Sequence, residues 1–203
     1  MKISIFGLGY VGTICAATFS SNGHNVIGVD VDSEKVDLIN SGESPIVEKG
    51  IDNLISMGHN ENLLSATLDS EYAVKNTEYA IICVGTPLLP NGDLDMSYIL
   101  KSAEIIGESL NNSDNFYTIS IRSTVMPGTH QMVEEIISNK SGKIPRKDFG
   151  VVSNPEFLRE GSALADFLNP PYTIVASKSE KALDKTKVLY SFVDSPFVEV
   201  DIS

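Results

Sequence analysis

The chain has 203 residues, of which 42% are hydrophobic and 21% charged, so it is long enough to form one large α/β domain around a buried core. Fifteen Lys and Arg residues stand against 27 Asp and Glu residues, which gives a formal net charge of −12 at pH 7. This charge argues against binding to a nucleic-acid backbone or an anionic membrane, but not against an anionic ligand held by backbone N–H groups.

The two cysteines, Cys15 and Cys83, lie in apolar segments without the spacing of a metal site. This placement is typical of small buried residues in a reducing compartment. No segment approaches the roughly 18 consecutive apolar residues of a membrane span, and the first residues lack the profile of a secretory signal. We therefore expect a cytoplasmic protein without a bound metal.

Short β-rich segments alternate along the chain with longer helical patterns. Strands are predicted at residues 3–6, 25–30, 79–84, 117–122, 149–153, 172–176 and 197–202. Helices are predicted at residues 10–22, 33–40, 48–57, 97–110, 129–139 and 180–192. The alternation predicts an α/β fold, a doubly wound and mostly parallel Rossmann-type sheet with helices on both faces, as one domain over residues 1–203. Ligands of such sheets bind at the carboxyl ends of the strands.

A glycine-rich turn follows the first predicted strand and opens the first helix. Gly7 permits the tight turn, Gly9 lets a pyrophosphate approach the backbone, and Gly12 allows close packing of helix and strand. Asp30, at the end of the second strand, is placed to accept hydrogen bonds from both ribose hydroxyls of adenosine. Its charge would repel a 2′-phosphate, which favours NAD over NADP. The alternatives are a plain glycine turn with Asp30 as a helix-start residue, and Lys35 as a solvated lysine instead of a contact to adenosine.

Hydroxyl residues follow the next two predicted strands. Thr86 could meet the cofactor or simply end its strand. Ser123 and Thr124 stand before a Pro–Gly turn and a new helix, where they could act at the crevice or satisfy loose backbone groups. From spacing alone, both interpretations stay open.

Two carboxylates follow the fifth predicted strand. Glu156 and Glu160 are four residues apart, so we expect them on one face of a helical turn. Such a pair can act as acid and base. Acidic residues also favour helix starts because of the helix dipole, and this interpretation remains open as well.

Together, these segments resemble the UDP-glucose/GDP-mannose dehydrogenase family along nearly the whole chain. The resemblance rests on residues 7–12, 44–48 (SPIVE), 84–87 (VGTP), 91–95 (NGDLD), 123–129 (STVMPGT) and 154–160 (NPEFLRE). Within the family, segments 91–95, 122–129 and 157–160 are most similar to the GDP-mannose 6-dehydrogenase subfamily. Such enzymes oxidise the C6 alcohol of a nucleotide sugar to a carboxylate in two NAD-dependent steps, through a cysteine-bound thioester.

The resemblance also assigns roles to particular positions. The residues implied to contact NAD are Tyr10, Val11, Asp30, Lys35, Thr86 and Thr124. Thr124 and Glu156 match positions that place the catalytic water and transfer protons. Phe157, Leu158 and Glu160 match positions that contact the nucleotide sugar, with Glu160 also near the cofactor. The resemblance further implies a homodimer in the full-length enzyme.

In full-length members, a long helix follows this domain and carries a lysine and an asparagine, and the nucleophilic cysteine comes later. None of these can be placed before Ser203, so we expect NAD binding without complete turnover. We also expect an exposed apolar surface where that helix packs, and hence association. Alternative substrates are UDP-glucose and UDP-N-acetylhexosamines. Alternative functions are a non-catalytic NAD-sensing module and a 3-hydroxyacid dehydrogenase, although the latter does not account for residues 154–160.

Overall fold

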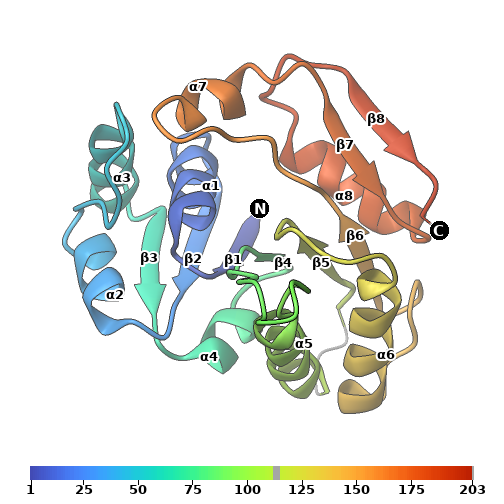
Figure 1. Cartoon of the computed structure of the whole chain (residues 1–203). Helices are drawn as coiled ribbons and strands as arrows, with labels where there is room; N and C mark the ends of the chain where they lie inside the picture. Colours follow the sequence, from blue (N-terminus) through green and yellow to red (C-terminus); the bar gives the residue numbers. More distant parts are fainter. Residues whose placement is uncertain (112–114, 203) are drawn as a thin grey trace.

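The computed structural model describes residues 1–111 and 115–202, which form an eight-stranded sheet with helices on both faces (Figure 1). The strands are β1 (Lys2–Phe6), β2 (Asn25–Val29), β3 (Leu64–Thr67), β4 (Tyr79–Ile82), β5 (Tyr117–Ile121), β6 (Phe149–Ser153), β7 (Thr173–Ala176) and β8 (Phe197–Val200). The helices are α1 (Tyr10–Ser21), α2 (Ser33–Asn40), α3 (Ile51–Asn60), α4 (Ser70–Lys75), α5 (Ser97–Leu110), α6 (Thr129–Ser141), α7 (Ala163–Leu168) and α8 (Glu180–Leu189).

The strand order is β3-β2-β1-β4-β5-β6-β7-β8, and all neighbouring strands run parallel except β6 and β7. The chain winds outward from β1 to β3 and then returns to place β4 on the other side of β1. This reversal opens a crevice beyond the carboxyl ends of β1 and β4, where doubly wound folds bind their ligands. The predicted fold class is confirmed.

Alternate side chains of the central strands enter two separate cores, one on each face of the sheet. Ile3 and Ile5 of β1 pack with α1, α3 and α7, whereas Phe6 packs with α4, α5 and α6. All four residues of β4 and all five of β5 are buried, as expected for strands covered on both faces. The same burial fixes the positions of the loops that leave these strands.

Several predicted elements need correction. The strand β3 and the helices α4 and α7 were not predicted from the sequence. The helix predicted at residues 48–57 begins only at Ile51, because Gly50 adopts a left-handed conformation with φ 87° and the side chain of Glu48 is bound elsewhere. Within the described residues, no helix has the length and apolarity needed to cross a lipid bilayer.

Candidate functional site

The glycine-rich turn between β1 and α1 has the geometry of a phosphate cradle. Gly7 has φ 94°, a conformation that L side chains rarely adopt. A Cβ on Gly12 would lie 1.8 Å from the carbonyl oxygen of Gly7, so only glycine fits there. A Cβ on Gly9 would meet no atom within 4 Å, so this N-cap of α1 faces open space. The free N–H groups and the positive end of the helix dipole therefore point at a space that suits a pyrophosphate.

Asp30 lies beside this turn, and its side chain is only 8% exposed. One carboxylate oxygen accepts a hydrogen bond from the N–H of Leu8 at 2.6 Å, and the other accepts one from the N–H of Asp32 at 3.0 Å. The interpretation of Asp30 as a helix-start residue is wrong, because Asp32 caps α2 by accepting from the N–H of Glu34. Lys35 places its Nζ atom 3.6 Å from a carboxylate oxygen of Asp30, so the two charges form an ion pair beside the turn.

A cavity of about 250 Å³ opens next to the glycine turn, between the loops that follow β1, β4, β5 and β6. The site residues predicted from the sequence that line it are Gly9, Tyr10, Val11, Thr86, Thr124 and Glu156. The fold thus brings together six positions that are spread in sequence from Gly9 to Glu156. We refer to this space below as the cofactor cavity.

The two hydroxyl residues after β5 have different surroundings. Ser123 donates to the carbonyl oxygen of Val84 at 2.6 Å and to that of Ile82 at 3.3 Å, so it satisfies backbone groups of the neighbouring loop. Thr124 is exposed and lines the cofactor cavity, and its hydroxyl has no hydrogen-bond partner within residues 1–111 and 115–202. Only Thr124 is therefore available to a ligand.

Residues 154–159 form an extended loop after β6, which we call the acidic loop together with residues 160–162. The predicted helical turn carrying Glu156 and Glu160 is wrong. No helix forms over residues 154–159, and the carboxylate of Glu156 instead accepts a hydrogen bond from the N–H of Leu158, two residues further on. Glu156 reaches the cofactor cavity, whereas Glu160 is exposed and lines neither this cavity nor the one described next.

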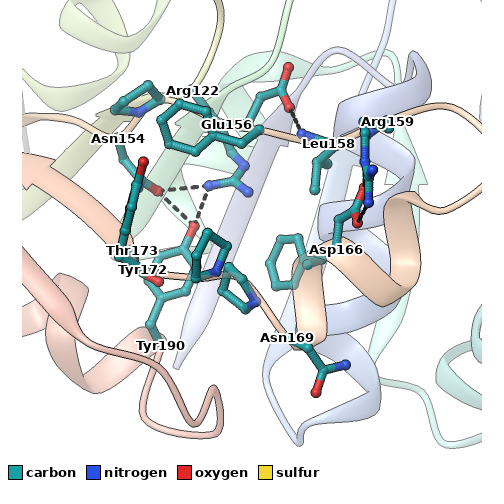
Figure 2. A pocket seen from close by; sticks show the side chains of 15 residues that line it. Arg122, Asn154, Glu156, Leu158, Arg159, Asp166, Asn169, Tyr172, Thr173 and Tyr190 are labelled. Carbon is teal, nitrogen blue, oxygen red and sulfur yellow. Dashed lines mark hydrogen bonds and ion pairs between the residues drawn. The ribbon is translucent and has the colours of Figure 1, made fainter.

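A second cavity of about 280 Å³ lies on the other side of the acidic loop (Figure 2). Phe157 and Leu158 line it, so the structure separates them from the residues around the cofactor turn. Phe157 is 53% exposed and packs edge-on against Tyr172, with ring centroids 5.9 Å apart. Arg159 forms an ion pair with Asp166 at 2.7 Å on the far wall of the same cavity.

Arg122, for which no role was predicted from the sequence, lies between the two cavities and lines both. Its side chain is buried against the stacked rings of Phe167 and Tyr190, and the guanidinium carbon lies 5.0 and 5.9 Å from their centroids. Its Nη1 atom donates to the side-chain oxygen of Asn154 at 3.0 Å and to the hydroxyl of Tyr190 at 2.8 Å (Figure 2). Arg122 and Glu156 line both cavities, so the positive charge of this guanidinium acts on both. A charged residue directly after a fully buried strand is the one signal that could have identified it.

Both cysteines are buried in the core beside the glycine turn. Cys15 has no exposed surface, whereas Cys83 is 8% exposed and lines the cofactor cavity. The hydrogen bond with Cys15 and burial raise the pKa of Cys83 well above its usual range, so this thiol stays protonated at neutral pH. Among the described residues, no group of three or more His, Cys, Asp or Glu residues could hold a metal ion.

Comparison with known proteins agrees with this geometry. The sequence pattern of the UDP-glucose/GDP-mannose dehydrogenase family, NAD binding domain, matches residues 1–194. GDP-mannose 6-dehydrogenase of Pseudomonas savastanoi pv. phaseolicola is 45% identical over 100% of this chain, which corresponds to 47% of that enzyme. UDP-glucose 6-dehydrogenase of Bacillus subtilis is 34% identical over 99% of this chain and 42% of that enzyme.

Among solved structures, a ternary complex of GDP-mannose dehydrogenase from Pseudomonas aeruginosa superposes with a TM-score of 0.97 and 45% identity. It covers 100% of this chain and 47% of that protein, so the chain spans about half the length of the relatives it matches. The ordered set of motifs, the sheet order and these similarities all agree. The chain belongs to the UDP-glucose/GDP-mannose dehydrogenase family and contains its NAD-binding domain.

Proposed function

We propose that this chain is the cofactor-binding half of a nucleotide-sugar 6-dehydrogenase that oxidises the C6 alcohol of GDP-mannose to a carboxylate. The observation that carries the proposal is the composition of the cofactor cavity. It joins the open face of Gly9 to Thr124 and Glu156, so a dinucleotide on the turn would reach a hydroxyl and a carboxylate. GDP-mannose is favoured because the relatives named for it are 45% identical, against 34% for the UDP-glucose enzyme.

NAD would be held along the crevice by residues from four segments. Gly7, Gly9 and Gly12 shape the turn for the pyrophosphate, and Asp30 and Lys35 would bind the adenosine ribose. Tyr10, Val11, Thr86 and Thr124 line the cavity beyond the turn, where the nicotinamide half would lie. The negative charge of Asp30 favours the ribose hydroxyls of NAD over the 2′-phosphate of NADP, even with Lys35 nearby.

The chemistry at the far end of the cavity depends on Thr124 and Glu156. When bound, NAD supplies the hydride acceptor for the alcohol carbon. Thr124 offers a hydroxyl that is not used inside the described part of the protein, and it would position a water molecule. Glu156 would transfer protons through the carboxylate oxygen that Leu158 does not occupy.

The nucleotide sugar would lie along the acidic loop. We propose that Glu156, Phe157, Leu158 and Glu160 contact it. Glu156 lines both cavities, whereas Phe157 and Leu158 line only the second one, so the sugar would extend from the cofactor cavity past Glu156 into the second cavity. In addition, we propose that the full-length enzyme is a homodimer in the cytoplasm. The two unpaired thiols in the core accord with such a reducing compartment.

Isothermal titration calorimetry with NAD, NADP and GDP-mannose tests this proposal. We expect the 203-residue chain to bind NAD more tightly than NADP. We expect no uronate, because both thiols are buried and no thioester can form on them. Absence of heat with NAD would contradict the proposal, and uronate formation by this chain would contradict the role assigned to the rest of the enzyme. Binding of NAD without any effect of GDP-mannose or UDP-glucose would favour an NAD-sensing module.

A further inference from the structure

The SPIVE segment at residues 44–48 has no role in the site described so far, yet it ends in a buried carboxylate. Glu48 is 6% exposed and lies in the loop between α2 and α3. Local hydrogen bonds fix this loop: the hydroxyl of Ser44 accepts from the N–H of Ile46 at 3.2 Å and donates to its carbonyl oxygen at 2.9 Å. Within the described residues, Glu48 has no ion pair with a basic side chain. A buried carboxylate in such surroundings needs hydrogen-bond donors.

Those donors come from the two segments that form the proposed site. The hydroxyl of Tyr10 donates to Glu48, and the N–H of Gly161 donates to the same carboxylate oxygen at 2.9 Å. The N–H of Gly161 also lies 3.0 Å from the hydroxyl of Tyr10. The three groups therefore form a closed arrangement, which we call the tether. Hydrogen bonds to a carboxylate are roughly twice as strong as those between neutral groups.

Each end of the tether lies next to a residue of the proposed site. Tyr10 is the first residue of α1, directly after Gly9, and it lines the cofactor cavity. Partial burial and the hydrogen bond with Glu48 raise the pKa of Tyr10, so its hydroxyl keeps the proton that it donates. Gly161 directly follows Glu160, and its φ of 85° suits glycine at the end of the acidic loop.

We propose that Glu48 is a positioning residue that holds the acidic loop against the first turn of α1, so that NAD binding and the order of this loop are coupled. The inference rests on the proposed function, because it takes NAD to bind at the glycine turn. A ligand that fixes the first turn of α1 also fixes Tyr10. Through the tether, it then restricts the loop that carries Glu156 and Glu160.

Hydrogen–deuterium exchange of the 203-residue chain, measured by mass spectrometry with and without NAD, tests the tether. In Glu48→Ala we expect the peptide over residues 156–162 to exchange at least about tenfold faster, since a charge-assisted hydrogen bond is lost. Glu48→Gln should lie between Glu48→Ala and wild type, because its amide oxygen can still accept. NAD should slow exchange of this peptide in wild type but not in Glu48→Ala, while peptides from β1 and β4 stay unchanged.

Two further variants keep the test decisive if Glu48→Ala does not fold. Tyr10→Phe removes the hydroxyl but keeps the carboxylate, and it should also uncouple the peptide from NAD. Glu43→Gln changes an exposed carboxylate of the same loop and should behave as wild type. Exchange at the wild-type rate in Glu48→Ala, or an equal increase in β1 and β4, would overturn the inference. A calorimetric titration separates the two proposals. If wild type does not bind NAD, the proposed function is refuted. If wild type binds NAD but the exchange rate of the peptide over residues 156–162 does not change, only the tether is refuted.

Discussion

Replacing Asp30 with alanine should weaken NAD binding by about 10- to 150-fold. Both oxygens of this carboxylate already accept a backbone N–H, from Leu8 at 2.6 Å and from Asp32 at 3.0 Å, which fixes its orientation before any ligand binds. We propose that the remaining lone pairs of the same carboxylate accept hydrogen bonds from the adenosine ribose. Hydrogen bonds to a charged group are worth about 1.5–3 kcal/mol, and each 1.4 kcal/mol is about tenfold in affinity, which gives the expected range.

The substitution also leaves the N–H of Leu8, a fully buried residue, without its acceptor. We therefore expect a loss of about 1–3 kcal/mol in the free energy of unfolding, measured by urea denaturation. Calorimetric titrations should accordingly be run far below the melting temperature. A dissociation constant equal to that of wild type, in a variant with native circular dichroism, would refute the assignment of Asp30 to the ribose.

Asp32→Ala is the matched control. Asp32 stands two residues further along and caps α2 by accepting from the N–H of Glu34 at 2.9 Å. Its loss should cost about 1 kcal/mol of stability, while the NAD dissociation constant stays within about twofold of wild type. Comparable losses of affinity in Asp30→Ala and Asp32→Ala would mean that the order of α2, not a ribose contact, controls binding.

Three further predictions concern the turn, the pH dependence and the buried arginine. Gly9→Ala should keep wild-type stability but bind NAD at least about tenfold more weakly in calorimetry, because its methyl group would occupy the space for the pyrophosphate. Gly12→Ala should fail to fold, because its methyl group would overlap the carbonyl oxygen of Gly7, and circular dichroism would show the loss of structure. Burial and the charge of Lys178 lower the pKa of His130 to about 4. The stability due to its neutral form is therefore present above about pH 6.5 and lost as the pH falls towards 4. The free energy of unfolding in urea should therefore decrease by about 2–3 kcal/mol between pH 6.5 and pH 4 in wild type. In His130→Gln this decrease should be absent. Tyr190→Phe should lower the free energy of urea unfolding by about 1–2 kcal/mol, because its hydroxyl bridges Arg122 and Asn154.

Motif and spacing were sufficient to predict the part of the site that a single short segment forms, the glycine-rich turn. The turn from Gly7 to Gly12 lies between two predicted elements, and its geometry follows from three glycines. The four-residue strand β4 was predicted because it is a continuous apolar run that is buried at every position. The strand β3 is equally short, but it contains Ser65 and Thr67 and is fully buried only at Leu64 and Ala66, so it has no such run. The helices α4 and α7 have six residues each, which is less than two turns and too short for a helical pattern to repeat.

The same rules failed in the acidic loop. A spacing of four residues predicts that Glu156 and Glu160 share a helix face only if a helix forms. Here residues 154–159 are not helical and Glu156 accepts a hydrogen bond from the N–H of Leu158, so Glu156 lines the cofactor cavity and Glu160 does not. Glu160 consequently ends near Gly161 and the tether instead of in the cofactor cavity. Its proposed contact with substrate thus depends on a distant residue, Glu48.

Arg122 could have been identified from the sequence by its position directly after a fully buried strand, where the spacing of acidic residues was misleading. The strand before it, β5, is buried at every position, so this arginine could only be solvated at the edge of the sheet or be paired inside the protein. Its partners Asn154 and Tyr190 lie 32 and 68 residues away in sequence, and only the fold brings them together. Both partners are neutral, and within residues 1–111 and 115–202 no carboxylate forms an ion pair with this guanidinium. A buried charge with neutral partners acts on whatever enters the adjoining cavities. For that reason, a charged residue that directly follows a fully buried strand is a better guide to the site than the spacing of exposed acids.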